Sequence, residues 1–223
     1  MSYSILFSLV LASCSFKNDK INAVDAYVQQ LHEEGKFEGT LAIGNKEGFV
    51  FEKAYGIADR SWNISFQHDT RLDICSINKS FVGVMIMQLV ESGRLKLEDP
   101  ITKHLNYSGP HADEVTIHQM LSHTSGLPDY DAIADSLKVR NVTPFKRMYF
   151  ESQDYIDFIS SLNPVSAPNQ RFYYSNFAYH LLAIIIEDKT NQSFSTALDS
   201  MICKPLGLTT TYAPENNEVI YER

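Results

Sequence analysis

The sequence predicts an α+β fold, and three hydrophobic patterns along the chain indicate it. Residues 21–34 place apolar side chains at helical spacing. Residues 37–52 alternate apolar and polar side chains on both sides of a glycine-bounded connection, which is the pattern of a β-hairpin. From residue 71 onward the apolar stretches are long and helical. We therefore expect a helix, a hairpin and then a mostly helical block.

The first helix is supported by its spacing and by the residue that follows it. Ile21, Val24, Val28 and Leu31 repeat at three and four residues, and Gly35 suits the end of a helix. In the hairpin, residues 37–43 and 49–52 alternate around a connection at 44–48. A two-stranded hairpin alone is marginally stable in water, so it needs further cover. We expect residues 56–70 to be irregular.

The helical block begins with an apolar run from Ile77 to Val90 that ends at Gly93. A helix that is apolar on most faces is expected to be central and buried. The chain then turns at Asp99-Pro100. Further helices are predicted over 116–123, 152–162, 176–190 and 194–208. Thr116 and Ser152 are the expected N-caps of the first two, and Pro205 and Gly207 are expected to stop the last.

Composition excludes some classes of function. The 223 residues are 44% hydrophobic and 21% charged, which is ordinary for a packed protein, and the formal net charge is −8. No cluster of Lys and Arg is visible, so we expect no nucleic-acid partner. The three cysteines show neither a CxxC pattern nor nearby histidine-rich spacing, so we expect no metal and no other cofactor.

The N-terminus predicts export. In "MSYSILFSLVLASC" a short apolar segment is followed by small residues and Cys14, although no Lys or Arg precedes it. The ending resembles the lipobox of bacterial lipoproteins. We therefore expect a signal peptide over 1–14 with lipid attached at Cys14, a polar tether over 15–20 and a domain over 21–223, divided into 21–70 and 71–223. A buried first strand or a misassigned start codon would be the alternative.

Ser76 and Lys79 are the first candidate catalytic pair. Residues three apart share one face of a helix, so the lysine nitrogen could reach the serine oxygen. An ammonium enclosed by apolar side chains gives up its proton more readily, which would let Lys79 act as a base toward the hydroxyl. The helix N-terminus would favour an oxyanion near the Ser76 N–H. The alternative is an N-capping serine with an exposed lysine.

Tyr174 and Asn176 form a second candidate group, directly before an apolar helix. A phenol could share a proton with a lysine and a serine, and an amide could hold a carbonyl substrate. The alternative is packing, because the aromatic residues around position 174 are clustered. Cys75 adjoins Ser76, but we interpret it as a small buried apolar side chain rather than a nucleophile.

Three segments then resemble one family. "ICSINKSFVGVMIMQLVESGRLKLEDPITKHL", "VTIHQMLSHTSGLPDY" and "APNQRFYYSNFAYHLLAIIIEDKTNQSFSTALDSMICKPLGLTTTY" resemble successive blocks of the serine beta-lactamase-related family, which includes class C beta-lactamases, D-alanyl-D-alanine carboxypeptidases and related esterases. The resemblance runs from about residue 22 to about residue 213. Asn169 and Asn191 stand where the family usually has Gly, at turn positions that Asn tolerates.

The resemblance implies a fold and residue roles. The fold would be beta-lactamase/transpeptidase-like, an antiparallel sheet with a helical subdomain. Ser76 would be the acylated nucleophile, Lys79 its general base and Tyr174 a partner in proton transfer. Asn176 would donate a hydrogen bond to the substrate amide or to Lys79. In "SHTSG" the family has a structural loop, so we do not assign His123 to catalysis, although a Ser–His pair would invite it.

One family element is missing from the sequence. The resemblance implies a Lys-Thr-Gly or His-x-Gly strand that supplies part of the oxyanion hole, with two more strands and a C-terminal helix, but no such tripeptide follows Tyr174. We expect the chain to lack these strands and this helix. It could be a fragment or an early-terminated frame of an ordinary hydrolase, a short protein completed by a partner chain, or a non-catalytic protein that keeps the pocket.

The expected function follows from the resemblance. It is an exported serine hydrolase of the bacterial cell envelope that forms an acyl-enzyme on an amide or ester, either of a small molecule or of a peptide. We expect this activity to be impaired in so short a chain. The alternative is a non-catalytic cell-envelope binding or remnant protein on the same scaffold. Contact with a membrane would be through the lipid anchor only. The sequence leaves the substrate and the oligomeric state open.

Overall fold

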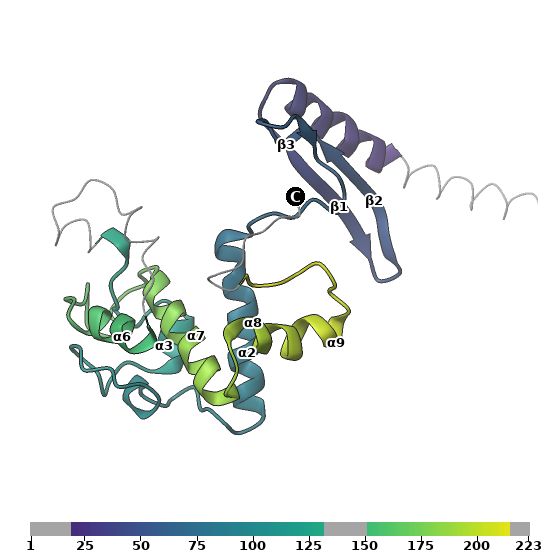
Figure 1. Cartoon of the computed structure of the whole chain (residues 1–223). Helices are drawn as coiled ribbons and strands as arrows, with labels where there is room; N and C mark the ends of the chain where they lie inside the picture. Colours follow the sequence, from purple (N-terminus) through teal and green to yellow (C-terminus); the bar gives the residue numbers. More distant parts are fainter. Residues whose placement is uncertain (1–18, 132–150, 215–223) are drawn as a thin grey trace, which may run out of the picture. The chain divides into compact units, whose positions relative to one another are not determined.

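The computed structural model describes residues 19–131 and 151–214 of the chain, so Cys14 and the predicted signal peptide lie outside the described residues. The chain divides into two compact units between Leu72 and Asp73. Figure 1 shows the N-terminal helix and strands in purple and dark blue, and the helices of the second unit in teal to yellow.

The first unit is a helix packed on a hairpin. The helix spans residues 19–33, and the hairpin consists of β1 (Gly39–Asn45) and β2 (Gly48–Tyr55), paired antiparallel. The strands run closer to the turn than predicted, because Asn45 pairs with Gly48 and its side-chain oxygen accepts the N–H of Glu47. The helix contacts β2 through Asp25, whose Oδ1 accepts hydrogen bonds from Lys53 at 2.6 Å and from Tyr55 at 2.9 Å.

The prediction that residues 56–70 are irregular is wrong in part. They contain a second small antiparallel pair, β3 (Ile57–Asp59) and β4 (Ile64–Ser65). Asn63 takes a left-handed φ of 52° in the connection, and the Asp59 carboxylate accepts the N–H groups of Ser61 and Trp62. Strands this short carry no clear alternation, because each contributes only one or two side chains to a face.

The second unit is helical. Its elements are η1 (Cys75–Ile77), α2 (Asn78–Glu91), η2 (Ile101–Lys103), α3 (Ile117–Leu121), α6 (Ser152–Ser160), α7 (Asn176–Thr190), α8 (Phe194–Leu198), η3 (Asp199–Cys203) and α9 (Lys204–Leu206). Apolar side chains from most of these elements form one core. Phe177 is fully buried there, with Tyr130, Tyr155 and Phe158 packed edge-on around it.

The expectation of a helix buried on most faces is wrong for α2. Its residues Val82, Met85, Ile86 and Leu89 are buried, but Val84 and Met87 on another face are 50% and 46% exposed. Within the second unit, α2 contacts α7 and η3. These elements bury one face only, and an apolar sequence cannot by itself tell a covered face from an uncovered one.

Helix N-caps and turn residues were predicted from the sequence, and one of the two predicted N-caps is wrong. Thr116 caps α3 in a complete capping box with Gln119, as expected for its side chain. The N-cap of α6 is Glu151 and not Ser152, a shift of one residue. Asn169 and Asn191 take left-handed φ values of 62° and 53°, so both turn positions have the conformation that Gly would take.

The predicted helix over 194–208 is confirmed as one run of helical backbone whose type changes along its length. The helix α8, the π-type turn η3 and the short α9 follow one another without a gap and end at Gly207, which is left-handed. Pro205 has no N–H with which to bond the carbonyl four residues earlier, that of Met201. The side-chain amide of Gln88 donates to that carbonyl at 3.3 Å, so a group from α2 bonds the carbonyl that Pro205 leaves without its helical donor.

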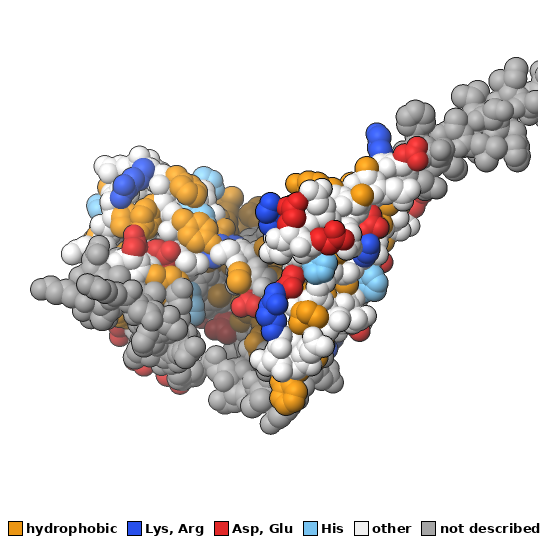
Figure 2. Space-filling view, turned by 90° about the horizontal axis from the view of Figure 1, so that it is seen from above, with side chains coloured by type: hydrophobic (Ala, Val, Ile, Leu, Met, Phe, Trp, Pro, Cys, Tyr) orange, Lys and Arg blue, Asp and Glu red, His pale blue; other side chains and the backbone are white. Residues whose placement is uncertain are grey.

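The surface of the described residues carries charges of both signs. On the face shown in Figure 2, Lys and Arg side chains stand singly among Asp and Glu. No helix within residues 19–131 and 151–214 has the length and apolar character needed to span a bilayer.

Candidate active site

Ser76 lies on a tight turn at the head of α2. It is the middle residue of η1, and Lys79 is the second residue of α2. Cys75 enters the turn with a left-handed φ of 47°, and its N–H is accepted by the Asp73 carboxylate at 2.8 Å. This turn presents the Ser76 side chain to solvent, where it is exposed. Cys75 is exposed too, so its interpretation as a buried side chain is wrong.

Two predicted site residues contact the Ser76 hydroxyl. The Tyr174 hydroxyl donates to Ser76 Oγ at 2.6 Å, and the Lys79 ammonium donates to the same oxygen at 3.5 Å. Tyr174 is 98 residues away in sequence, on the segment that leads into α7. The structure therefore brings the serine, the lysine and the tyrosine together, and the shortest contact is the one to the phenol.

Lys79 is held from α7. Its ammonium donates to Asn176 Oδ1 at 2.8 Å and lies over the rings of Tyr174 and Tyr179, 4.9 Å and 5.5 Å from their centroids. Asn176 is the first residue of α7, so the helix start fixes where its side chain leaves the backbone. The expected donation from Asn176 to Lys79 is reversed here, because an ammonium has donors and no acceptor.

A loop after α3 supports the segment that carries Tyr174 and Asn176. The carbonyl of His123 accepts the N–H of Tyr173 at 2.8 Å, and the carbonyl of Pro128 accepts the buried Ser175 hydroxyl at 2.7 Å. Gly126 turns the loop with φ of 76°, and a Cβ placed there would lie 2.1 Å from the Ser166 carbonyl oxygen. This close backbone approach requires glycine.

His123 packs against Tyr174 and not against Ser76. Its ring packs at a tilt against those of Tyr174 and Tyr179, with centroids 4.5 Å and 5.0 Å away, and its Nδ1 accepts the N–H of Ser175 at 3.2 Å. Burial, together with the charge of Lys79, lowers the pKa of His123 below its ordinary value of 6.5. A neutral imidazole whose Nδ1 already accepts a backbone N–H holds Tyr174 in place, which fits the structural role expected for it.

Tyr174 has an electrostatic environment that favours its phenolate. Burial by itself would raise its pKa, but the hydrogen bonds to Lys79 and Ser76 and the Lys79 charge outweigh burial, so the pKa lies below the ordinary 10.0. A phenol with a lowered pKa, in contact with a serine hydroxyl, is a chemically reasonable proton acceptor.

Asp129 is a site residue that the sequence analysis missed. Its carboxylate is half-buried and accepts the backbone N–H and the side-chain amide of Asn176. Burial raises the pKa of this carboxyl above its ordinary 3.8, and the donors from Asn176 and Tyr130 oppose that shift. The only sequence signal was an acidic residue directly after Gly-Leu-Pro in the predicted loop, which is also an ordinary turn composition.

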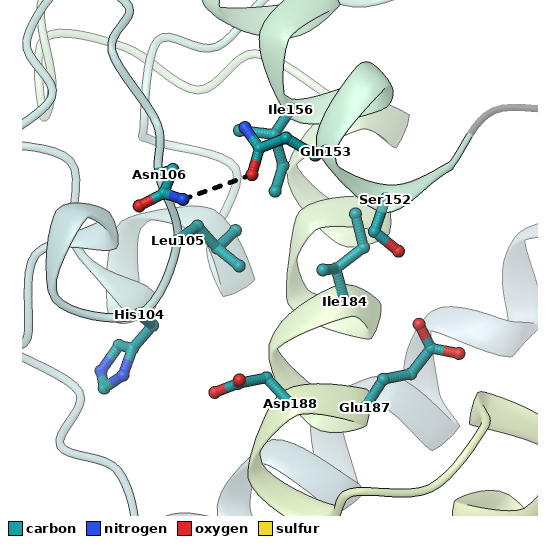
Figure 3. A pocket seen from close by; sticks show the side chains of 9 residues that line it. All are labelled: His104, Leu105, Asn106, Ser152, Gln153, Ile156, Ile184, Glu187 and Asp188. Carbon is teal, nitrogen blue, oxygen red and sulfur yellow. Dashed lines mark hydrogen bonds between the residues drawn. The ribbon is translucent and has the colours of Figure 1, made fainter.

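A separate hollow of about 380 Å³ lies between α6, the second half of α7 and residues 104–106. Figure 3 shows its lining, in which the Asn106 amide donates to Gln153 across a 3.4 Å contact. Its lining contains none of the four predicted site residues. Within the described ranges, no three His, Cys, Asp or Glu side chains are arranged to hold a metal ion.

The chain is similar to known proteins along most of its length. The chain is 32% identical over 206 residues to the protein Flp of Staphylococcus aureus, covering 90% of this chain and 40% of Flp. It is 29% identical over 219 residues to the esterase EstB of Burkholderia gladioli, covering 91% of this chain and 52% of EstB. The chain thus spans about half or less of the length of these curated relatives.

Among solved structures, the octameric penicillin-binding protein homologue from Pyrococcus abyssi superposes with a TM-score of 0.72. It is 29% identical, and the match covers 85% of this chain and 43% of that one. The fold is therefore beta-lactamase/transpeptidase-like and α+β. The model of the family described as Beta-lactamase matches residues 24–220, nearly all of the described chain. With the Ser76, Lys79 and Tyr174 cluster at the head of α2, this match shows that the chain belongs to the Beta-lactamase family.

Proposed function

We propose that this chain carries the nucleophile and the proton-transfer groups of a serine hydrolase that forms an acyl-enzyme on an ester or an amide. The observation that carries the proposal is the position of Ser76 Oγ, which lies 2.6 Å from the Tyr174 hydroxyl and 3.5 Å from the Lys79 ammonium. A serine hydroxyl is a weak nucleophile unless a neighbouring base takes its proton.

The proton transfer follows from these distances. With Tyr174 ionised beside the Lys79 ammonium, the Ser76 hydroxyl donates its proton to the phenolate while Oγ bonds to the substrate carbonyl carbon. The tetrahedral intermediate collapses when the ester or amide bond breaks, and Tyr174 returns the proton to the leaving oxygen or nitrogen. Water then attacks the acyl-serine by the same route and releases the acid. In this route Tyr174 takes the base role that the resemblance assigned to Lys79, and the Lys79 ammonium, held by Asn176 at 2.8 Å, stays beside the phenolate.

Stabilisation of the oxyanion limits the expected rate. The Ser76 N–H is one donor, and the resemblance places the second on a strand whose tripeptide does not occur after Tyr174 in these 223 residues. Loss of one such donor typically costs a factor of about 10²–10³. For these residues alone we therefore propose slow acylation.

The substrate class and the location are part of the same proposal. The relative named an esterase supports an ester, and the resemblance to carboxypeptidases favours an amide of a D-amino acid peptide as the second candidate. We further propose export and lipid anchoring at Cys14, which the N-terminal sequence supports. Intact mass of the membrane-extracted protein tests this, because the added diacylglyceryl mass should vanish in Cys14→Ala.

A covalent probe tests the catalytic proposal. The folded chain is incubated with a fluorophosphonate or a penicillin, and intact mass and peptide mapping locate the adduct. We expect one adduct on Ser76, none in Ser76→Ala, and normal labelling in Ser80→Ala, which changes a serine four residues further on, in the first turn of α2. A folded chain that forms no adduct at Ser76 under prolonged incubation would overturn the proposal and favour a non-catalytic binding protein.

A further inference from the structure

Asp129 makes more contacts with Asn176 than helix capping requires. Its carboxylate accepts the Asn176 N–H at 3.1 Å and the side-chain Nδ2 at 3.2 Å and 3.0 Å, one to each oxygen. Capping of α7 is already provided by Ser175, whose hydroxyl accepts the N–H of Ala178 at 3.1 Å. The two contacts to Nδ2 therefore need another explanation.

These contacts determine which way the Asn176 amide faces. A primary amide has a donating end and an accepting end. With Nδ2 bound by the Asp129 carboxylate, Oδ1 necessarily faces away from it, toward the Lys79 ammonium at 2.8 Å. The flipped amide would place a donor against an ammonium and an acceptor against a carboxylate, so both contacts would become repulsive.

We propose that Asp129 is a positioning residue that locks the Asn176 amide so that its Oδ1 holds Lys79 beside Tyr174 and Ser76. The inference rests on the proposed function, because the group being positioned is the proposed proton-transfer machinery. Among the residues that the structure describes, the Asp129 carboxylate has no hydrogen bond to Ser76 or Lys79, and it acts on them through Asn176.

The loop geometry supports this role. Asp129 directly follows Gly126, Leu127 and Pro128, all buried, and the loop is fastened to the Tyr174 segment by the Pro128 and His123 carbonyls. The carboxylate therefore sits on a fixed backbone at the first turn of α7. A rigid support of this kind is what keeps a reacting group within the narrow range of productive geometries.

The test uses Asp129→Asn, which keeps the shape of the side chain but replaces one accepting end by a donor. In this variant both amides can turn, so Lys79 loses its fixed acceptor. We expect the rate of Ser76 labelling by a fluorophosphonate to fall about tenfold to a hundredfold. The matched control is Asp131→Asn, which removes a carboxylate of the same loop that accepts from Tyr173 and not from Asn176.

A second readout does not depend on activity. Tyr174 is faced by Lys79 from α2, by His123 from the loop after α3, by Tyr179 from α7 and by the Asp129 carboxylate. Loss of the Asp129 charge alone would lower the pKa of Tyr174, whereas displacement of Lys79 would raise it. We expect the ultraviolet titration of Tyr174, identified by difference from Tyr174→Phe, to move upward in Asp129→Asn.

The two readouts separate the two proposals. If wild type is never labelled but the titration moves upward, the catalytic proposal fails and the positioning role stands. In an Asn176→Ala background, Asp129→Asn should no longer raise the pKa of Tyr174, because the group through which it acts is gone. A pKa that falls or stays constant in Asp129→Asn, with far-UV circular dichroism like that of wild type, would overturn the positioning role.

Discussion

The contact of 2.6 Å between Tyr174 and Ser76, against 3.5 Å for Lys79 and Ser76, predicts that Tyr174 and Lys79 act as one unit. The perturbation is the pair Tyr174→Phe and Lys79→Met, alone and combined. A positioned general base contributes a factor of about 10²–10⁴, or roughly 3–5 kcal/mol of barrier. Either single change removes the phenol or the charge that favours its phenolate form, so each should cost this whole factor.

The labelling rate of the combined variant should fall by no more than about the same factor, because either single change already abolishes the contribution that the two residues make together. Independent contributions would instead multiply to about 10⁴–10⁸. The assay is the second-order rate of adduct formation at Ser76, followed by intact mass. Tyr179→Phe is the matched control: its ring also lies over Lys79, but its hydroxyl donates to the Leu121 carbonyl, so labelling should stay within about threefold. If the two rate losses multiply in the combined variant, Tyr174 and Lys79 act independently and the prediction is wrong.

Three further predictions concern stability, each measured by urea unfolding. Cys75→Gly should stabilise by about 0.5–1 kcal/mol, because Gly relieves a left-handed φ of 47°, while Cys75→Ala should not; equal effects would contradict this. Gly126→Ala should destabilise by roughly 2–5 kcal/mol, since its Cβ meets the Ser166 carbonyl, and a neutral result would exclude the close approach. Asp99→Asn should destabilise by about 1–3 kcal/mol at pH 7. The hydrogen bond from Lys103, opposed by burial, holds the pKa of Asp99 below 3.8 in the folded state. The ionised carboxylate therefore contributes fully to the free energy of unfolding above pH 3.8, and this contribution is lost as the pH falls through the folded-state pKa. The difference in free energy of unfolding between Asp99→Asn and wild type should therefore shrink in acid. A difference independent of pH would show that the ionised carboxylate is not its cause.

Expectations that concern one element at a time were largely correct. The period of apolar residues located the first helix, the hairpin, α2 and α7, because side-chain direction repeats with backbone geometry. The capping box at Thr116 and the left-handed turn at Asn191 were equally local. Errors arose where neighbouring elements decide the outcome, as at α2, where Val84 and Met87 are exposed although the apolar run predicted burial on most faces.

In the candidate site too, local placement could be predicted from the sequence, whereas contacts between distant residues could not. Ser76 and Lys79 were placed together by a separation of three residues, which any helix start would bring onto one face. By itself the sequence thus indicated the family, which the comparisons show, and placed Ser76 beside Lys79 as the candidate nucleophile and its neighbour. Only the tertiary structure decided that the phenol lies closest to the serine, that the Asn176 amide accepts from Lys79, and that Asp129 holds it there. These contacts join residues 98, 97 and 47 positions apart, and at such separations packing of the loop after α3 against the start of α7 sets the distances, while residue periodicity carries no information about them.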